Sequence, residues 1–161
     1  MEGDDDVWVV ILTGAGQVFS AGAGLKAVAA GQINSLYTER GGFAGFVTAK
    51  RTKPWIAAIE GLALAGGCEI ALACDMIVAT EGGALGLPEV SRGLLAAAGG
   101  VVRLPRRIPP SIAMELILTG NRLPSERTLA LGLVNKLASK GGAVSAAHAL
   151  ASEILQNAPL A

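Results

Sequence analysis

Apolar positions along this chain follow two different patterns. Three short runs, at 7–13, 54–59 and 76–79, are continuously apolar and rich in β-branched residues, which is typical of strands covered on both faces of a parallel sheet. Segments with helical spacing lie between and after them, at 25–30, 43–50, 67–73, 111–118, 125–131 and 143–156. Strands that alternate with helices predict an α/β fold, a layered sheet core flanked by crossover helices.

Glycine and proline mark the expected ends of several elements. Pro110 can occupy the first turn of one helix, Gly120 can end it, and Ser125 is a candidate N-cap for the next. The segment 31–42 has little periodicity and predicts a mobile surface loop that could cover a site. The 22 glycines gather at strand-to-helix junctions, where they serve either close approach of a ligand or tight packing of the layers.

The composition fits one domain with a substantial core and no strong overall charge. Of 161 residues, 52% are hydrophobic, and 13 basic residues balance 13 acidic ones. We therefore expect no general attraction to nucleic acid or to an anionic membrane surface. Two basic clusters, at 50–53 and 103–107, could be ordinary solvated surface or could contact an anionic ligand.

The cysteines and the N-terminal residues both indicate a soluble, cytoplasmic protein. Residues 1–6 are acidic and lack the basic-then-apolar pattern of a secretory signal, and no apolar run is long enough to span a bilayer. Cys68 and Cys74 lie on different faces of one expected helix among apolar neighbours. This placement predicts buried free thiols in a reducing compartment.

Three kinds of site have weak support in the sequence. The turn at 14–16 is similar to a dinucleotide-binding loop, but its third glycine and the acidic residue after a second strand are missing. Ser20 could act as a nucleophile with His148 as its base, but His148 lies in an ordinary amphipathic helix. No spacing of cysteine and histidine suits a metal site.

Two acidic residues, Glu69 and Glu89, lie in the most apolar and glycine-rich part of the chain. An ionised carboxylate is costly to bury without partners, so such positions are rarely kept for packing. Glu69 follows a glycine pair that would open a helix, where free backbone N–H groups can receive negative charge. The pattern predicts proton transfer at a carbon next to a carbonyl; a helix cap or a buried ion pair with an arginine is the structural alternative.

Motifs in a fixed order resemble the crotonase (enoyl-CoA hydratase/isomerase) superfamily over essentially the whole chain. They occupy 10–16, 19–26, 53–61, 65–75, 86–90, 99–105, 118–120 and 132–135. The resemblance implies the ClpP/crotonase-type α/β fold and an acyl-CoA thioester as substrate. It implies reversible hydration of a 2-enoyl-CoA to a 3-hydroxyacyl-CoA, without a metal and without a cofactor besides the coenzyme A of the substrate.

The resemblance also implies roles for particular residues. The backbone N–H groups of Ala23 and Gly66 would form an oxyanion hole for the thioester oxygen, where one donor is worth about 2.7–4 kcal/mol. Glu69 would help to activate the water that adds at the β-carbon, and Glu89 would supply or remove the proton at the α-carbon. Neighbouring residues would contact the substrate: Ala21, Gly22, Gly24, Leu25, Lys26, Ala65, Gly67, Pro88 and Ala97.

The resemblance suggests which part of the substrate some of these residues, and a few others, would contact. Lys26 lies beside the oxyanion loop and either meets the phosphates of coenzyme A or serves as ordinary surface. Leu25, Val28 and the segment 31–42 would border the acyl chain.

Several positions depart from the family pattern and bear on the acyl group. Gly24 stands where the family commonly has aspartate, Ala96-Ala97 replaces Pro-Gly, and Ala65 replaces the first glycine of a Gly-Gly-Gly loop. The segments 41–45 and 107–110 are similar to those of the carnitinyl-CoA dehydratase branch. A crotonobetainyl-CoA (carnitinyl-CoA) hydratase or an enoyl-CoA isomerase is therefore an alternative activity.

The chain is also shorter than the family's usual subunit. By resemblance, residues 1–161 form a single crotonase-type core that lacks the family's N-terminal strands and helix and its C-terminal helices. If nothing replaces these parts, an exposed sheet edge and an apolar patch are expected. A non-catalytic acyl-CoA-binding fragment is then a further alternative. Family members are usually trimers or dimers of trimers, which implies a homotrimer or hexamer.

Overall fold

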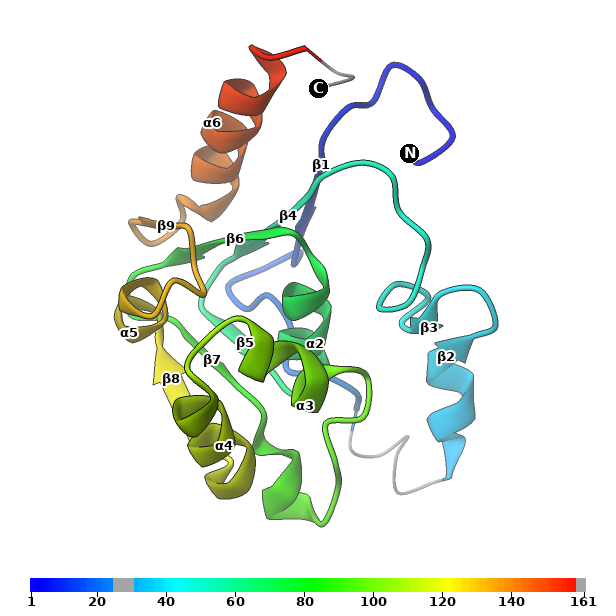
Figure 1. The fold of residues 1–161 in the computed structure, drawn as a ribbon, viewed down its shortest axis with the longest axis vertical. Coiled ribbons are helices and arrows are strands. Elements are labelled where there is room, and N and C mark those ends of the chain that lie inside the picture. The colour runs from blue at the N-terminus through cyan, green and yellow to red at the C-terminus, as the bar shows by residue number, and fades with distance from the viewer. Residues whose placement is uncertain (25–30, 159–161) are drawn as a thin grey trace.

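A parallel sheet forms the centre of the fold (Figure 1). The computed structural model describes residues 1–24 and 31–158, so the expected helix at 25–30 lies outside the described residues. The sheet has four strands in the order β1-β4-β6-β9, and each neighbouring pair is parallel. These strands are β1 (Val10–Thr13), β4 (Trp55–Ile59), β6 (Met76–Thr80) and β9 (Lys136–Ala138).

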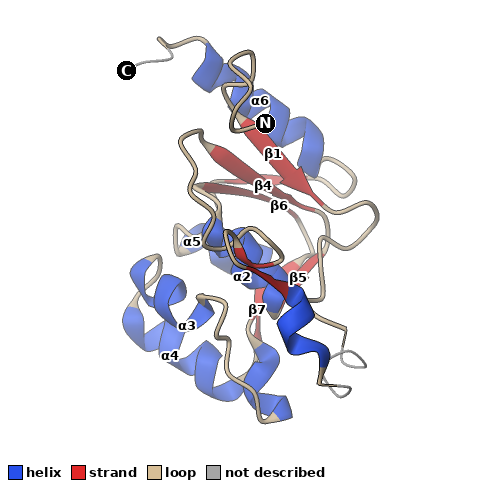
Figure 2. Ribbon diagram, turned by 90° about the vertical axis from the view of Figure 1, so that its right-hand side faces the viewer, coloured by secondary structure: helices blue, strands red, loops and turns tan. Residues whose placement is uncertain are grey.

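Alternating residues of the central strands bury two opposite faces, as the continuously apolar runs predict. Helix α6 (Ala143–Leu155) covers one face, and its alanines at 143, 147 and 151 pack against Ile56 and Val78. Helix α2 (Gly66–Ala73) covers the other face, where Ile59 and Ile77 are fully buried. Figure 2 shows the two helices on opposite sides of the main sheet. The predicted α/β architecture is confirmed.

A second, smaller sheet lies beside α2 and positions the site. Strand β5 (Leu62–Leu64) pairs in parallel with β7 (Ala84–Gly86), and β8 (Arg122–Pro124) pairs antiparallel with β7. Each strand has only three residues, too few to show a period-two pattern, so the sequence did not predict them. A 3₁₀ helix, η2 (Pro88–Arg92), follows β7 directly.

Three helices and one 3₁₀ helix complete this side of the molecule: α3 (Gly100–Arg103), η3 (Leu104–Arg106), α4 (Pro110–Thr119) and α5 (Ser125–Ala130). Helix α4 begins with Pro110 and ends at Gly120, whose φ of 69° is left-handed, as predicted. The prediction that Ser125 caps α5 is wrong. Pro124 occupies the N-cap, and the Ser125 hydroxyl is buried inside the first turn without a hydrogen-bond partner among the described residues.

The expected surface loop at 31–42 has regular structure. Residues Gln32–Leu36 form a 3₁₀ helix (η1), and β2 (Tyr37–Thr38) pairs antiparallel with β3 (Gly42–Phe43). The rings of Tyr37 and Phe43 meet edge to face, with centroids 5.6 Å apart. The segment is therefore a short hairpin that presents two aromatic side chains.

The predicted helix at 43–50 is also wrong; the segment after β3 is a series of turns. Gly42, Ala44 and Gly45 have left-handed φ values of 64°, 54° and 66°, which a right-handed helix does not allow. In a helix the carbonyl of Phe46 would accept from the N–H four residues on. Here it accepts from the Ala49 N–H at 3.1 Å, three residues on, and from the Arg51 guanidinium at 2.9 Å.

Each basic cluster combines exposed side chains, Lys50 and Arg106, with arginines that bind main-chain carbonyls. Arg51 also donates to the Ala73 carbonyl at 2.5 Å, and its guanidinium lies 4.4 Å from the centre of the Phe46 ring. Arg107 donates to the Leu72 carbonyl at 3.3 Å and to the Asp75 carbonyl at 2.7 Å. These arginines tie loops to the end of α2 through main-chain carbonyls, which accept charge-assisted hydrogen bonds.

Both cysteines are buried free thiols, as predicted, and burial raises the pKa of each thiol to about 12.

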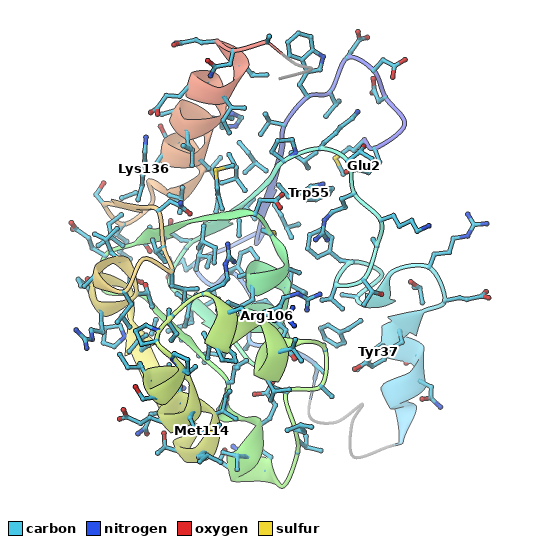
Figure 3. The ribbon with its side chains drawn as sticks, in the orientation of Figure 1. Glu2, Tyr37, Trp55, Arg106, Met114 and Lys136 are labelled. Atoms are coloured by element: carbon cyan, nitrogen blue, oxygen red, sulfur yellow. The ribbon has the colours of Figure 1, made fainter. Side chains whose placement is uncertain are left out.

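Among the described residues, no helix is long and apolar enough to cross a membrane. Strand β1 forms one edge of the main sheet. Met114 on α4, labelled in Figure 3, is 55% exposed, and Leu118 on the same helix is 65% exposed.

The Arg51 contacts generate a prediction about stability. Arg51→Met removes a charged donor from two main-chain carbonyls, so we expect the free energy of unfolding to fall by about 1–3 kcal/mol. Urea titration measures this change. Lys50→Met, one residue away at an exposed position, is the matched control and should change stability by less than about 0.5 kcal/mol. Equal losses in the two variants would contradict the assigned contacts.

Candidate active site

A cavity of about 590 Å³ opens between α2, η2 and the β2–β3 hairpin. It brings together residues far apart in the sequence, including both glutamates. The predicted site residues that line it are Ala21, Ala23, Ala65, Gly66, Glu69, Pro88, Glu89 and Ala97.

Backbone pairing places Ala23 next to the start of α2. Ser20 forms a parallel bridge with Ala63, and the Leu64 N–H donates to the Ser20 carbonyl at 2.9 Å. Farther along, a Cβ on Gly22 would lie 2.8 Å from the Gly66 nitrogen. The segment 20–23 and the start of α2 therefore approach each other at a distance that only glycine allows. This contact brings Ala23 and Gly66, the predicted oxyanion donors, into one wall of the cavity.

Gly66 is the first residue of α2, so its N–H has no partner within the helix and lies at the helix's positive end. A Cβ here would lie 2.5 Å from Cζ of Phe43, so the Phe43 ring packs directly on this residue. The preceding Ala65 has φ 50° and ψ −129°, a conformation that is strained for any residue except glycine. Here the departure from the family's triple glycine has a local conformational cost.

Glu69 lies in the first turn of α2 and is 3% exposed. Its Oε1 accepts a hydrogen bond of 2.8 Å from the N–H of Gly100, the first residue of α3. Burial raises the pKa of Glu69 to about 7; the N–H groups of Gly100 and Ala98 and the Arg103 guanidinium oppose this rise, and the Glu89 charge adds to it. The carboxyl group can therefore gain or lose a proton near neutral pH.

Glu89 lies in the first turn of η2 and is half-buried. Its Oε2 is buried and has no hydrogen-bond partner among the described residues. Burial raises the pKa of this carboxyl group above its ordinary value, although its own backbone N–H opposes the shift. Two carboxyl groups with raised pKa values thus face one cavity, an arrangement typical of acid–base sites.

Of the other predicted residues, Gly22, Gly24 and Gly67 are described and do not line this cavity. Gly67 packs on the Ser20 backbone, where a Cβ would lie 2.4 Å from the Ser20 carbonyl oxygen, and Gly24 is exposed. Leu25 and Lys26, like Val28, lie outside the described residues.

The alternative motifs do not form sites in the described part of the chain. His148 is exposed on α6, which covers the face of the main sheet opposite α2. The Ser20 hydroxyl accepts a hydrogen bond of 3.2 Å from the Gly22 N–H. The nucleophile–base pair is therefore wrong. A Cβ at Gly14 would lie 2.5 Å from the Phe19 carbonyl oxygen, so this glycine serves packing.

The segment 31–42, expected to border the acyl chain, contributes Tyr37 to the cavity lining, whereas three other lining residues, Arg92, Leu94 and Arg122, were not predicted. Tyr37 projects from β2 toward the centre of the molecule (Figure 3), beside the ring of Phe43. Arg92 at the end of η2 and Arg122 on β8 add two guanidiniums, and Leu94 is one of the apolar residues between them. Arg92 lies three positions after Glu89, a signal that the sequence offered; the place of Arg122 depends on the unpredicted pairing of β7 with β8.

The raised pKa of Glu69 generates a prediction about stability. Between pH 4.5, the ordinary pKa, and about 7, the folded chain holds a proton that the unfolded chain releases, so the free energy of unfolding falls as pH rises through this window. Relative to Glu69→Gln, the parent should lose up to about 3 kcal/mol between pH 4.5 and 8 in denaturant titrations. Glu81→Gln, at an exposed position, should keep the parent's slope. Parallel curves for parent and Glu69→Gln would refute the shift.

Comparison with known proteins identifies the family. The enoyl-CoA hydratase/isomerase family model matches residues 1–161. The carnitinyl-CoA dehydratase of Salmonella typhi is 42% identical over 160 residues, covering 98% of this chain and 61% of that protein. The chain therefore spans 61% of the length of this curated relative.

Solved structures agree with this match. The enoyl-CoA hydratase from Mycobacterium tuberculosis has a TM-score of 0.93 at 55% identity, over 99% of this chain and 62% of that one. The carnitinyl-CoA dehydratase from Mycobacterium avium has a TM-score of 0.91 at 46% identity, over 99% and 63%. The expected crotonase-type fold is confirmed, and this chain belongs to the enoyl-CoA hydratase/isomerase family.

Proposed function

We propose that the protein catalyses the reversible addition of water to a 2-enoyl-CoA thioester, giving a 3-hydroxyacyl-CoA. One observation carries the proposal: Glu69 and Glu89 line the same cavity as Ala23 and Gly66, whose N–H has no partner within α2. The family membership and the relatives named enoyl-CoA hydratase support it.

The main-chain amides would stabilise charge on the thioester oxygen. As water adds at the β-carbon, the electrons of the double bond move toward the carbonyl and negative charge gathers on its oxygen. The N–H groups of Ala23 and Gly66 are held by packed backbone, so they need no reorganisation when the charge appears. The positive end of α2 adds to the stabilisation at Gly66.

The two carboxyl groups would divide the proton transfers. Ionised Glu69 accepts a proton from the water whose oxygen bonds to the β-carbon, and protonated Glu89 donates a proton to the α-carbon. In dehydration each transfer reverses. The raised pKa values suit both tasks, because Glu69 titrates near neutrality and Glu89 is held above its ordinary range. No metal or further cofactor enters this proposal; coenzyme A belongs to the substrate.

The charge of the cavity favours an acyl group that carries no positive charge. Arg92 and Arg122 are exposed on the cavity wall and make no hydrogen bond or ion pair with described side chains. The trimethylammonium group of a carnitinyl thioester would be repelled by these two guanidiniums. Among the described residues, the only carboxyl groups that line the cavity are Glu69 and Glu89, which are assigned to the reaction. Dehydration of carnitinyl-CoA is the second candidate, because relatives carry that name and because Tyr37 and Phe43 offer aromatic faces to a cation.

Assembly and location enter the proposal as expectations. Exposed Met114 and Leu118 on α4 are suited to contact between subunits, and the family resemblance implies a homotrimer or hexamer. A cytoplasmic location remains a prediction.

Substitution of the glutamates tests the hydratase proposal. Glu69→Gln and Glu89→Gln should each lower turnover of crotonyl-CoA by about 10²- to 10⁴-fold, because each removes one proton transfer. Thioester affinity should stay within about threefold, and the distant Glu81→Gln should match the parent. Loss of absorbance of the conjugated enoyl thioester measures the rate. If the parent binds the thioester but does not turn it over, the non-catalytic alternative replaces this one; equal non-zero rates in the parent and both variants would refute the roles of the two glutamates.

A pair of thioesters tests the acyl group. The parent should show a higher kcat/KM for crotonyl-CoA than for crotonobetainyl-CoA. In the double variant Arg92→Gln, Arg122→Gln the ratio of these two kcat/KM values should fall by about five- to tenfold, because two charges that repel the cationic thioester are removed. A parent that prefers the cationic thioester would favour the carnitinyl assignment instead.

A further inference from the structure

We infer that Arg103 is a positioning residue that couples the two halves of the proposed catalytic machinery. Its guanidinium joins the turn that carries Phe43, packed on Gly66, to the segment that holds the Glu69 carboxylate. The inference rests on the proposed function, because it concerns the residues assigned there to the oxyanion hole and to water activation.

Arg103 reaches both segments through one planar group. Nη1 donates to the Ala98 carbonyl at 3.0 Å, and Nη2 donates to the Val47 carbonyl at 2.5 Å. Arg103 does not line the active-site cavity; it lines a neighbouring cavity of about 430 Å³, together with Arg106. It therefore acts through other residues rather than on the substrate.

The backbone is built around this guanidinium. Gly99 has a left-handed φ of 111°, and a Cβ there would lie 1.7 Å from Nη1 of Arg103. The Arg103 N–H also donates to the Gly99 carbonyl at 2.8 Å. A side chain at 99 would displace the guanidinium from this position, and the left-handed φ would strain any residue except glycine.

The Ala98 carbonyl, one of the two groups that Arg103 binds, lies in the segment that holds the Glu69 carboxylate. The segment 98–100 presents its N–H groups to Glu69, with Gly100 at 2.8 Å from Oε1 and Ala98 as a second donor. The carbonyl of the same Ala98 is the one that Arg103 holds. If this contact is lost, both donors to the carboxylate are free to shift.

The Val47 carbonyl, the other group that Arg103 binds, lies in the turn that follows Phe43. Val47 is 3% exposed, and its N–H donates to the Phe43 carbonyl at 3.3 Å, which closes the turn. The Phe43 ring in turn contacts Gly66, where a Cβ would lie 2.6 Å from Cε1. The Val47 carbonyl contact with Arg103 thus fixes the ring that confines Gly66.

Arginine suits this position better than lysine. A guanidinium offers donors in a rigid plane to two carbonyls at once, whereas an ammonium is a point charge on a flexible stem. The charged groups that act on Glu69 are Glu89 from η2 and Arg103 from α3; the nearby Cys68 thiol stays neutral. Removing Arg103 takes away a cation and loosens two donors, and both changes raise the pKa of Glu69.

Arg103→Met, Arg103→Lys and the control Arg106→Met test the inference. Arg106 lies on η3, is exposed and lines the same neighbouring cavity, but donates no side-chain hydrogen bond to the described residues. The pKa of Glu69 is followed by carbon-13 NMR of labelled glutamate, assigned with Glu69→Gln. Polarisation of the thioester carbonyl is followed by the infrared C=O stretch of bound butyryl-CoA, and the rate with crotonyl-CoA gives kcat and KM.

We expect Arg103→Met to raise the pKa of Glu69, to reduce the shift of the C=O stretch and to lower kcat at least tenfold with KM within threefold. Arg103→Lys keeps the positive charge but cannot donate to both carbonyls from one planar group. The pKa of Glu69 should therefore stay closer to the parent's value, while the shift of the C=O stretch remains reduced. Arg106→Met should match the parent in all three. Near-UV circular dichroism confirms folding; if Arg103→Met is unfolded, Arg103→Lys decides.

Parent-like values for Glu69 and for the C=O stretch in a folded Arg103 variant would overturn the inference. Failure of the proposed function gives a different result. In that case the parent shows no hydration at any pH, yet the pKa of Glu69 still responds to Arg103 and not to Arg106.

Discussion

The hydrogen bond between the Gly100 amide and the buried Glu69 carboxylate is the contact on which the rest of the site depends. A carboxyl group that is 3% exposed needs a donor, and no side chain in the described part of the chain supplies one. Helix α3 must therefore begin against the first turn of α2, and Gly99 must turn the chain there in a left-handed conformation. This arrangement of helix ends sets the depth of the cavity and the direction in which Glu69 faces.

A second constraint is the contact between backbone segments at the oxyanion wall. Gly22, Gly66 and Gly67 each stand where a Cβ would meet another group at under 3 Å. Side chains at Gly22 and Gly67 would separate the segment 20–23 from the start of α2 and would move the two amides apart, whereas one at Gly66 would displace the Phe43 ring. The many glycines of the chain thus act at a few positions as packing residues that make close amide geometry possible.

The sequence predicted three of the four strands of the main sheet, β1, β4 and β6, and four of the helices, and it singled out Glu69 and Glu89, because each gives a strong local signal. Buried strands are continuously apolar, and a carboxylate in an apolar stretch is conspicuous. The turn at 43–50 was mispredicted because its apolar spacing imitates a helix. Its conformation is decided instead by left-handed residues and by Arg103, which lies 56 residues from Val47. The lining position of Arg122 depended on strands too short to show a pattern.

The way the β2–β3 hairpin and its following turn are attached affects local dynamics. The hairpin has two paired positions, and the turn contacts the main body through the guanidiniums of Arg51 and Arg103 and the packing of Phe43 and Phe46. The central sheet, in contrast, has a continuous ladder of strand pairing. We therefore expect the aromatic wall of the cavity to open locally, so that its amides exchange hydrogen with solvent faster than those of β4 and β6.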